Sequence, residues 1–197
     1  MALKNNLVII SLFITFFISL IGCEQKESFR RKTYSKNGFY ISLREIPEWI
    51  ELSAEQLPWG QAFLRVDSTR QGFITSYFRD TINLSLRSSQ VRIEYFSRKL
   101  PNCSTNDSVT MYIAKIMGRK YNGMEIKRDT AAFETSDGKN VGWVEAVSRM
   151  NQMWMAWAYI PRTDGYYVAL NLTCYNENDF KLMRDKFKDL ALSYREK

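Results

Sequence analysis

The segment from Met153 to Ile160 (MWMAWAYI) constrains the fold more than any other stretch of the chain, because it is apolar at every position. A strand with one face in water alternates apolar and polar side chains. A strand that is apolar on both faces is buried between two layers. The segment therefore predicts a central strand of a sheet that is covered on both sides.

Four strand-length segments, this one included, follow one another in the second half of the chain. The stretches between them are short and polar, as in Ser136-Asp137-Gly138-Lys139. Strands joined by tight turns pair as antiparallel neighbours, so the four segments predict an antiparallel meander. They are residues 124–133, 141–149, 153–160 and 166–174. Alternating apolar residues predict three earlier strands, at residues 39–43, 82–86 and 91–95.

Two amphipathic helices accompany the strands. One is predicted from the capping residues 104–106 to Gly118, with apolar residues three and four positions apart. The other is predicted from about Glu177 to Tyr194, after Asn176 as its N-cap. These elements together predict an α+β domain, a mostly antiparallel β-sheet covered by helices in an α/β/α sandwich.

The N-terminus has the pattern of an export signal. Lys4 precedes a predominantly apolar segment of 14 residues, 7–20 (LVIISLFITFFISL), which is the length of a secretory apolar core and short for a membrane span. The next residues, Leu20-Ile21-Gly22-Cys23, resemble the bacterial lipoprotein box. The resemblance implies cleavage between Gly22 and Cys23 and attachment of lipid to Cys23. An uncleaved N-terminal anchor with a chance cysteine is the alternative.

This resemblance implies a domain organisation and a compartment. Residues 1–22 are a lipoprotein signal peptide, residues 23–37 a lipid-anchored flexible tether, and residues 38–197 a single globular domain. Glu24, in place of an aspartate, does not match the inner-membrane retention signal, which favours an outer-membrane location in the cell envelope. The basic run 30–32 in the tether either contacts an anionic surface or is simply solvated.

Two kinds of modification are predicted from short patterns. Once Cys23 carries lipid, Cys103 and Cys174 either pair as a disulfide or remain buried thiols. Four Asp-Ser or Asp-Thr sites resemble the acceptor for O-glycosylation in Bacteroidetes, although such pairs also start turns and cap helices. The four candidate acceptors are Ser68, Thr81, Ser108 and Thr130.

The sequence contains no histidine, which excludes Ser-His-Asp and Cys-His catalysis and the usual zinc sites. It also has no phosphate-binding glycine loop of the expected spacing, and no cofactor or metal is predicted. Glu94 and Glu145 could act as a glycosidase pair. The favoured interpretation is that both are solvent-facing strand residues beside Arg92 and Arg149. The chain is therefore expected not to be an enzyme.

Five tryptophans make an aromatic binding surface conceivable. Trp143, Trp154 and Trp157 lie in predicted strands and are expected to pack in the core. Trp59 follows Pro58 and precedes Gly60, so it is expected in an irregular surface loop. Pro58 and Trp59 are therefore the candidate binding surface.

The order of elements resembles the PsbP-like fold. The residues that carry the resemblance are 38–41 with Pro47 and Trp49, the Asp137-Gly138 turn, residues 164–167 and the closing segment 187–193. These are fold positions, and the segment from Trp59 to Tyr77 has no clear counterpart in the family. The resemblance implies a scaffold for binding or assembly, with no shared catalytic residues.

The leading hypothesis is a lipid-anchored, non-enzymatic binding or assembly module for another envelope macromolecule. The alternatives are an immunity lipoprotein that neutralises a secreted toxin, or a carbohydrate-binding or carbohydrate-processing protein. The expected partners are the membrane, through the N-terminal lipid, and another envelope protein. Nucleic acid is not an expected partner, since an exported chain with no recognition motif does not meet it. The oligomeric state stays open.

Overall fold

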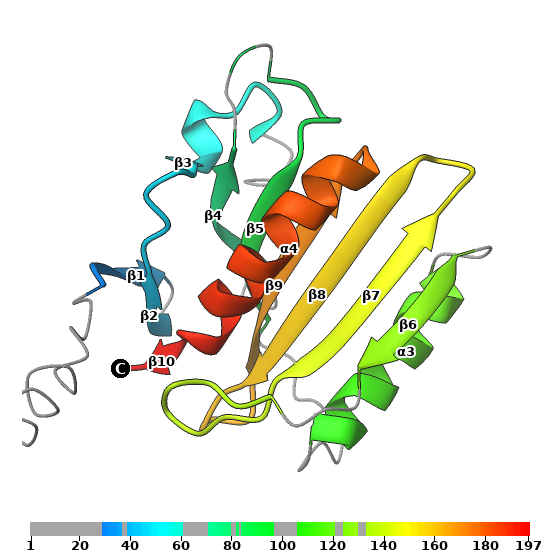
Figure 1. Ribbon diagram of the computed structural model, residues 1–197. Helices are drawn as coiled ribbons and strands as arrows, with labels where there is room; N and C mark the ends of the chain where they lie inside the picture. The colour runs from blue at the N-terminus through cyan, green and yellow to red at the C-terminus, as the bar shows by residue number, and fades with distance from the viewer. Residues whose placement is uncertain are drawn as a thin grey trace, which may run out of the picture.

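The computed structural model describes residues 29–36, 39–60, 71–79, 82, 84–96, 106–120, 124–129 and 133–197. These residues form a large sheet, a small sheet and two long helices (Figure 1). The helices lie on opposite faces of the large sheet.

The large sheet has seven strands, and every neighbouring pair is antiparallel. In spatial order the strands are β3 (Ile50–Leu52), β4 (Gln71–Phe78), β5 (Gln90–Phe96), β9 (Tyr167–Cys174), β8 (Met153–Pro161), β7 (Gly142–Ser148) and β6 (Glu125–Asp129). Consecutive strands β6 to β9 form the meander. Strand β8 lies inside the sheet and is buried from Met155 to Ile160, which confirms the central strand predicted from its apolar composition.

The small sheet has three strands in the order β1-β2-β10. Strands β1 (Arg31–Lys36) and β2 (Phe39–Arg44) are antiparallel, and the two-residue strand β10 (Arg195–Glu196) pairs with the other edge of β2. Because β10 comes directly after the C-terminal helix, the small sheet joins the two ends of the described chain (Figure 1).

Helix α4 (Glu177–Leu192) covers one face of the large sheet. The side chain of Asn176 caps it by accepting a hydrogen bond from the backbone N–H of Asp179 at 2.7 Å. The helix buries one stripe of apolar residues against the sheet, namely Phe180, Met183, Phe187, Leu190 and Ala191. The predicted cap is confirmed, and so is the predicted amphipathic character of the helix, although α4 ends two residues before Tyr194.

Helix α3 (Asn106–Lys120) covers the opposite face. Its buried Val109 and Ile113 pack in one cluster with Val144, Met155 and Trp157 of strands β7 and β8. Gly142 allows the close approach, because a Cβ there would lie 2.2 Å from a methyl carbon of Val109. The predicted fold class, a mostly antiparallel sheet covered by helices, is confirmed.

Several boundaries differ from the prediction. Ile82 and residues 84–87 lie in turn or irregular backbone rather than in a strand, and Ile82 and Leu86 are 77% and 64% exposed. The hydroxyl groups of Ser85 and Ser88 accept backbone N–H bonds there and favour a turn. Helix α3 continues past Gly118 to Lys120.

The prediction of a tether to residue 37 is wrong for residues 31–36, which form β1. The edge strand β1 pairs with β2 along one side, and its Tyr34 is buried against the large sheet. Residues 23–28 lie outside the described part of the chain.

Candidate binding groove

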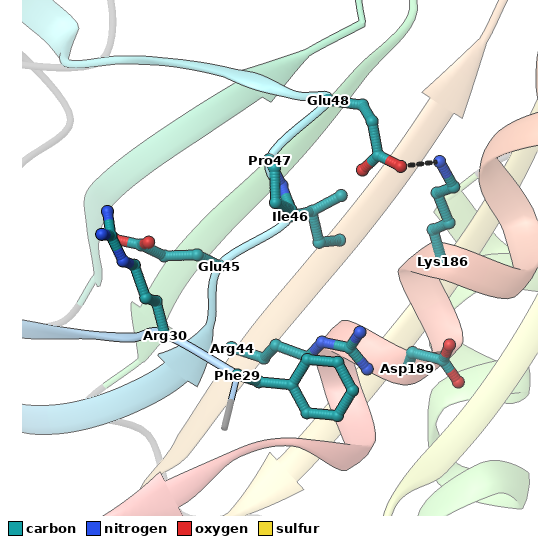
Figure 2. A pocket seen from close by; sticks show the side chains of 9 residues that line it. All are labelled: Phe29, Arg30, Arg44, Glu45, Ile46, Pro47, Glu48, Lys186 and Asp189. Atoms are coloured by element: carbon teal, nitrogen blue, oxygen red, sulfur yellow. Dashed lines mark hydrogen bonds and ion pairs between the residues drawn. The ribbon is translucent and has the colours of Figure 1, made fainter. Parts of the chain in front are cut away.

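A groove of about 890 Å³ lies between the start of the small sheet, the β2–β3 connection and the second half of α4. Three segments far apart in the sequence line it, as Figure 2 shows. They contribute Phe29 and Arg30 before β1, the residues from Arg44 at the end of β2 to Glu48, and Lys186 and Asp189 on α4. Lys186 and Asp189 are three positions apart, so they share one face of the helix.

An ion pair closes one end of the groove. The Lys186 Nζ donates to the Glu48 Oε1 at 2.7 Å, and it is drawn as a dashed line in Figure 2. This hydrogen bond is the main reason that the pKa of Glu48 lies below its ordinary value. Both side chains are about half exposed, so the pair is open to exchange with a partner's charges.

The other end of the groove has an aromatic contact. The Arg44 guanidinium lies 3.1 Å from the centroid of the Phe29 ring, and the Phe29 side chain is 46% exposed. The backbone N–H of Arg44 donates to Ser193 Oγ at 2.9 Å, which ties this end of β2 to the end of α4. Ile46 and Pro47 lie between the two ends and add apolar surface.

The predicted binding surface at Pro58 and Trp59 is only partly exposed. Pro58 is exposed, but Trp59 is half-buried because its ring packs edge-on against Phe78 with centroids 6.4 Å apart. Its indole Nε1 is buried and has no hydrogen-bond partner among the described residues. A binding role for the two residues stays a prediction.

The other tryptophans lie in or against the core. Trp49, Trp143 and Trp157 are 7%, 1% and 5% exposed, and Trp154 is half-buried against the same core. Sugar-binding platforms require exposed rings. The described tryptophans therefore give the carbohydrate-binding alternative no exposed platform.

Glu94 and Glu145 lie on opposite faces of the large sheet. Glu145 faces α4, where it accepts hydrogen bonds from Arg184 Nε at 2.6 Å and from Trp143 Nε1 at 3.0 Å. Glu94 is on the α3 side and accepts from Asn171 Nδ2 at 2.8 Å. The sheet separates the two carboxylates, so they cannot flank one glycosidic bond.

The interpretation of both carboxylates as solvent-facing residues beside Arg92 and Arg149 is also wrong for Glu145, which is only 14% exposed. Arg149 instead pairs with Glu125 at 3.0 Å. Across the described part of the chain, no group of three or more His, Cys, Asp or Glu residues is placed to hold a metal ion.

Most of the predicted modification sites lie outside the described residues. These are Cys23, Ser68, Thr81, Cys103 and Thr130, together with Gly22. Ser108 is half-buried in the first turn of α3. Cys174 is a free and fully buried thiol at the end of β9, and burial is the main reason that its pKa rises to about 12.

None of the helices within the described ranges combines the length and the apolar character that a membrane crossing requires. No family model matches the chain, and no curated protein matches it.

The fold is similar to that of solved structures. CyanoP, the cyanobacterial PsbP from Synechocystis sp. PCC 6803, matches with a TM-score of 0.50 at 12% identity, over 89% of this chain and 98% of that one. The Ran-binding protein Mog1p of Saccharomyces cerevisiae matches with a TM-score of 0.45 at 12% identity, over 84% and 89%. The similarity to CyanoP supports the PsbP-like fold predicted from the sequence. At this level of identity it is evidence for the fold and not for a shared function.

The groove was not predicted from the sequence. Its three lining segments, at residues 29–30, 44–48 and 186–189, are far apart in the chain, and none has a motif of its own. The one available signal was the amphipathic C-terminal helix, because the side opposite its apolar stripe lies at the surface.

Proposed function

We propose that this chain is a lipid-anchored protein of the bacterial cell envelope whose folded domain binds another envelope macromolecule without catalysing a reaction. The proposal depends on the position of the groove, which opens at Phe29, six residues beyond Cys23. Six residues span at most about 20 Å when fully extended. A partner in the groove would therefore be held close to the membrane.

The composition of the groove supports binding to a protein. Apolar atoms of Phe29, Ile46 and Pro47 lie among side chains of both charges, and an apolar centre with a charged rim is typical of protein interfaces. The opposite placement of Glu94 and Glu145 supports a non-catalytic role, because it removes the one catalytic pair that the sequence suggested.

The anchor is tested by mass spectrometry of the protein purified from its own membranes. We expect the leader to be absent and Cys23 to be the first residue, carrying acyl chains. A Cys23→Ser variant should lose the lipid and leave the outer-membrane fraction. An intact leader, or unmodified Cys23 in the wild-type protein, would contradict the proposal.

The groove is tested by site-specific photo-crosslinking in intact cells. The crosslinker is placed at the exposed Pro47 and, as a control, at Met150, which is 90% exposed on the β7–β8 turn. We expect one repeated crosslinked protein at Pro47 and none at Met150, and we expect Glu48→Lys to weaken that crosslink. Equal products at both sites, or none, would refute binding in the groove. A secreted toxin as the product would favour the immunity alternative.

A further inference from the structure

The outer face of the small sheet carries four cations. In the register of the sheet, Arg31 lies opposite Arg44 across β1 and β2, and Arg195 lies opposite Ser42 on the same face. The backbone N–H of Lys197 donates to Tyr40 O, and its Nζ donates to Thr33 Oγ1 at 3.0 Å. We call Arg31, Arg44, Arg195 and Lys197 the cationic face. The opposite face of the sheet is apolar and packs on the large sheet through Tyr34, Ile41 and Leu43.

None of these four cations forms an ion pair within the described residues. The Arg31 guanidinium is bound by neutral oxygens only, namely the Oγ and the carbonyl of Ser42 and the carbonyl of Ser193. Arg44 lies over the Phe29 ring. The pKa of Arg31 is lowered by burial and then by the charge of Arg195, which shows that the two cations lie close enough to repel each other.

Eight cations elsewhere on the domain lie within 4 Å of a carboxylate oxygen: Lys32, Arg79, Lys139, Arg149, Arg162, Lys181, Arg184 and Lys186. Other exposed cations, such as Arg87 and Lys115, also have no ion pair within the described residues, but they lie on separate elements. Unpaired like charges gathered on one sheet face are unfavourable for folding. The gathering of four unpaired cations on one face indicates that this face is complementary to an external anion.

Three carboxylates lie at the margins of this face. Asp137 accepts hydrogen bonds from the Glu196 backbone N–H and from Thr135 Oγ1, and its charge also acts on Arg31. Asp189 and Glu48 line the groove beside Arg44, and Arg44 contributes to the lowered pKa of Glu48. Within the described residues none of the three forms an ion pair with the four cations, so the face keeps its positive charge.

The face also carries aromatic side chains. It lies at the N-terminal end of the described chain, on the side of the proposed lipid anchor. Tyr40 of β2 is 50% exposed, and Phe29, two residues before β1, is 46% exposed. The amphipathic ring of a tyrosine favours the boundary between water and lipid. Strands β1, β2 and β10 lie together at one end of the molecule (Figure 1).

We propose that the cationic face rests on the membrane surface and binds the phosphate groups of anionic phospholipids. This inference rests on the proposed lipid anchor, which would hold the face within a short chain length of the headgroups. Each Lys or Arg near an anionic surface contributes roughly fivefold to the binding constant, and the attraction decays within a Debye length of about 10 Å. The lipid anchor then supplies attachment, and the face supplies orientation.

The test uses the mature lipidated protein reconstituted on vesicles, either of phosphatidylcholine alone or of phosphatidylcholine with phosphatidylglycerol. Phenylglyoxal modifies accessible arginines, and peptide mass spectrometry gives the rate at each residue. On the anionic vesicles we expect Arg44 and Arg195 to react about fivefold more slowly. Arg149, whose side chain is 80% exposed on the β7–β8 turn, should react equally on both. Equal rates at Arg195 on both vesicles would overturn the proposal.

A matched pair of variants separates specific from general charge effects. Arg195→Glu with Lys197→Glu should abolish the protection of Arg44. Arg87→Glu with Lys115→Glu makes the same change of charge at exposed residues outside the cationic face, and it should leave the protection of Arg44 unchanged. Loss in both variants would show that only net charge matters. In salt of about 1 M, where the Debye length falls to about 3 Å, the protection should disappear in the wild-type protein.

The two proposals fail in distinguishable ways. Without a lipid anchor, the protein would not float with phosphatidylcholine vesicles. Flotation with the phosphatidylglycerol vesicles would then test the face by itself, and its absence would refute the face. A protein that floats with both kinds of vesicle but shows no arginine protection keeps its anchor and refutes the inference.

Discussion

The two sheets of this protein differ in how many of their faces are covered. The seven-stranded sheet is covered by α4 on one face and by α3 on the other. The three-stranded sheet buries only its inner face and leaves Tyr40 and the cationic face exposed. The large sheet therefore provides most of the buried core, whereas the small sheet has an outer surface that packing does not determine. Because packing does not constrain this outer surface, its side chains are available for the membrane contact proposed above.

The small sheet is attached to the large one through aromatic and polar contacts. The hydroxyl groups of Tyr34 in the small sheet and Tyr77 in the large sheet form a hydrogen bond with each other. The rings of Phe39 and Tyr95 lie 4.4 Å apart. Ser193 at the end of α4 accepts the backbone N–H of Arg44. This attachment predicts that the small sheet is lost whenever the large sheet unfolds, and that it can loosen without the large sheet.

The largest effect is expected in the core of the large sheet. Phe187 of α4 is fully buried, and its ring lies 5.3 Å from that of Trp143. Phe187→Ala should lower the free energy of unfolding by about 3 to 5 kcal/mol, because it leaves a cavity. Urea denaturation measures this. Leu182→Ala on the exposed side of the same helix should change it by less than about 0.5 kcal/mol. Similar losses in both variants would contradict the proposed division between core and surface.

A smaller effect is expected where the two sheets meet. Burial and the nearby Tyr77 raise the pKa of Tyr34 well above its ordinary value, so both hydroxyl groups are neutral at physiological pH. Tyr34→Phe leaves the buried Tyr77 hydroxyl without this partner and should cost about 1 to 3 kcal/mol. The double variant with Tyr77→Phe should recover most of that loss. Hydrogen exchange of β1 and β2 amides should rise in the single variant, with the amides of β8 unchanged.

The two sheets also differ in how well their sequences predict them. Strand β8 was predicted because it is continuously apolar, which indicates cover on both faces. Helix α4 was predicted because its apolar residues recur with the helical period. Strand β1 was not predicted, because Arg31, Thr33 and Lys32 are polar on both faces and only Tyr34 is buried. Strand β10 is two residues long and exists only because it pairs with β2. Such strands depend on tertiary contacts, which no local pattern records.

The candidate surfaces were less predictable than the fold for the same reason. The groove and the cationic face combine residues near position 30, residues near position 45 and residues between 186 and 197. Their side chains are ordinary surface residues in the sequence. Only the register of β1, β2 and β10 places the four cations on one face. Only their contacts in the structure show that they have no ion pair within the described residues.

The pH dependence of stability should report on the large sheet. The Cys174 thiol has a pKa of about 12 in the folded chain against 9.0 for an ordinary cysteine, mainly because it is buried. The neutral Cys174 thiol contributes its full share to the free energy of unfolding below pH 9. This share is lost as the pH rises from 9 towards 12, because the thiol ionises in the unfolded chain at a lower pH than in the folded chain. Between pH 8.5 and 10 the free energy of unfolding should fall by about 1 kcal/mol more in the wild-type protein than in Cys174→Ala. Parallel pH curves for the two proteins would show that this thiol is not buried.

The smallest effect is expected on the cationic face. Arg195 and Lys197 are exposed and form no ion pair with the residues that the structure describes, so Arg195→Ala with Lys197→Ala should change the free energy of unfolding by less than about 0.5 kcal/mol. Relief of the repulsion between Arg195 and Arg31 acts in the stabilising direction. Thermal and urea denaturation measure the change, with Lys115→Ala and Arg87→Ala as the control. A clear loss of stability would mean that the two cations belong to the fold, and the contrast between a structural large sheet and an outward-facing small sheet would no longer hold. If this variant keeps its free energy of unfolding but loses the arginine protection on anionic vesicles, the two residues belong to the membrane contact. Residues that stabilised the fold would change the free energy of unfolding as well.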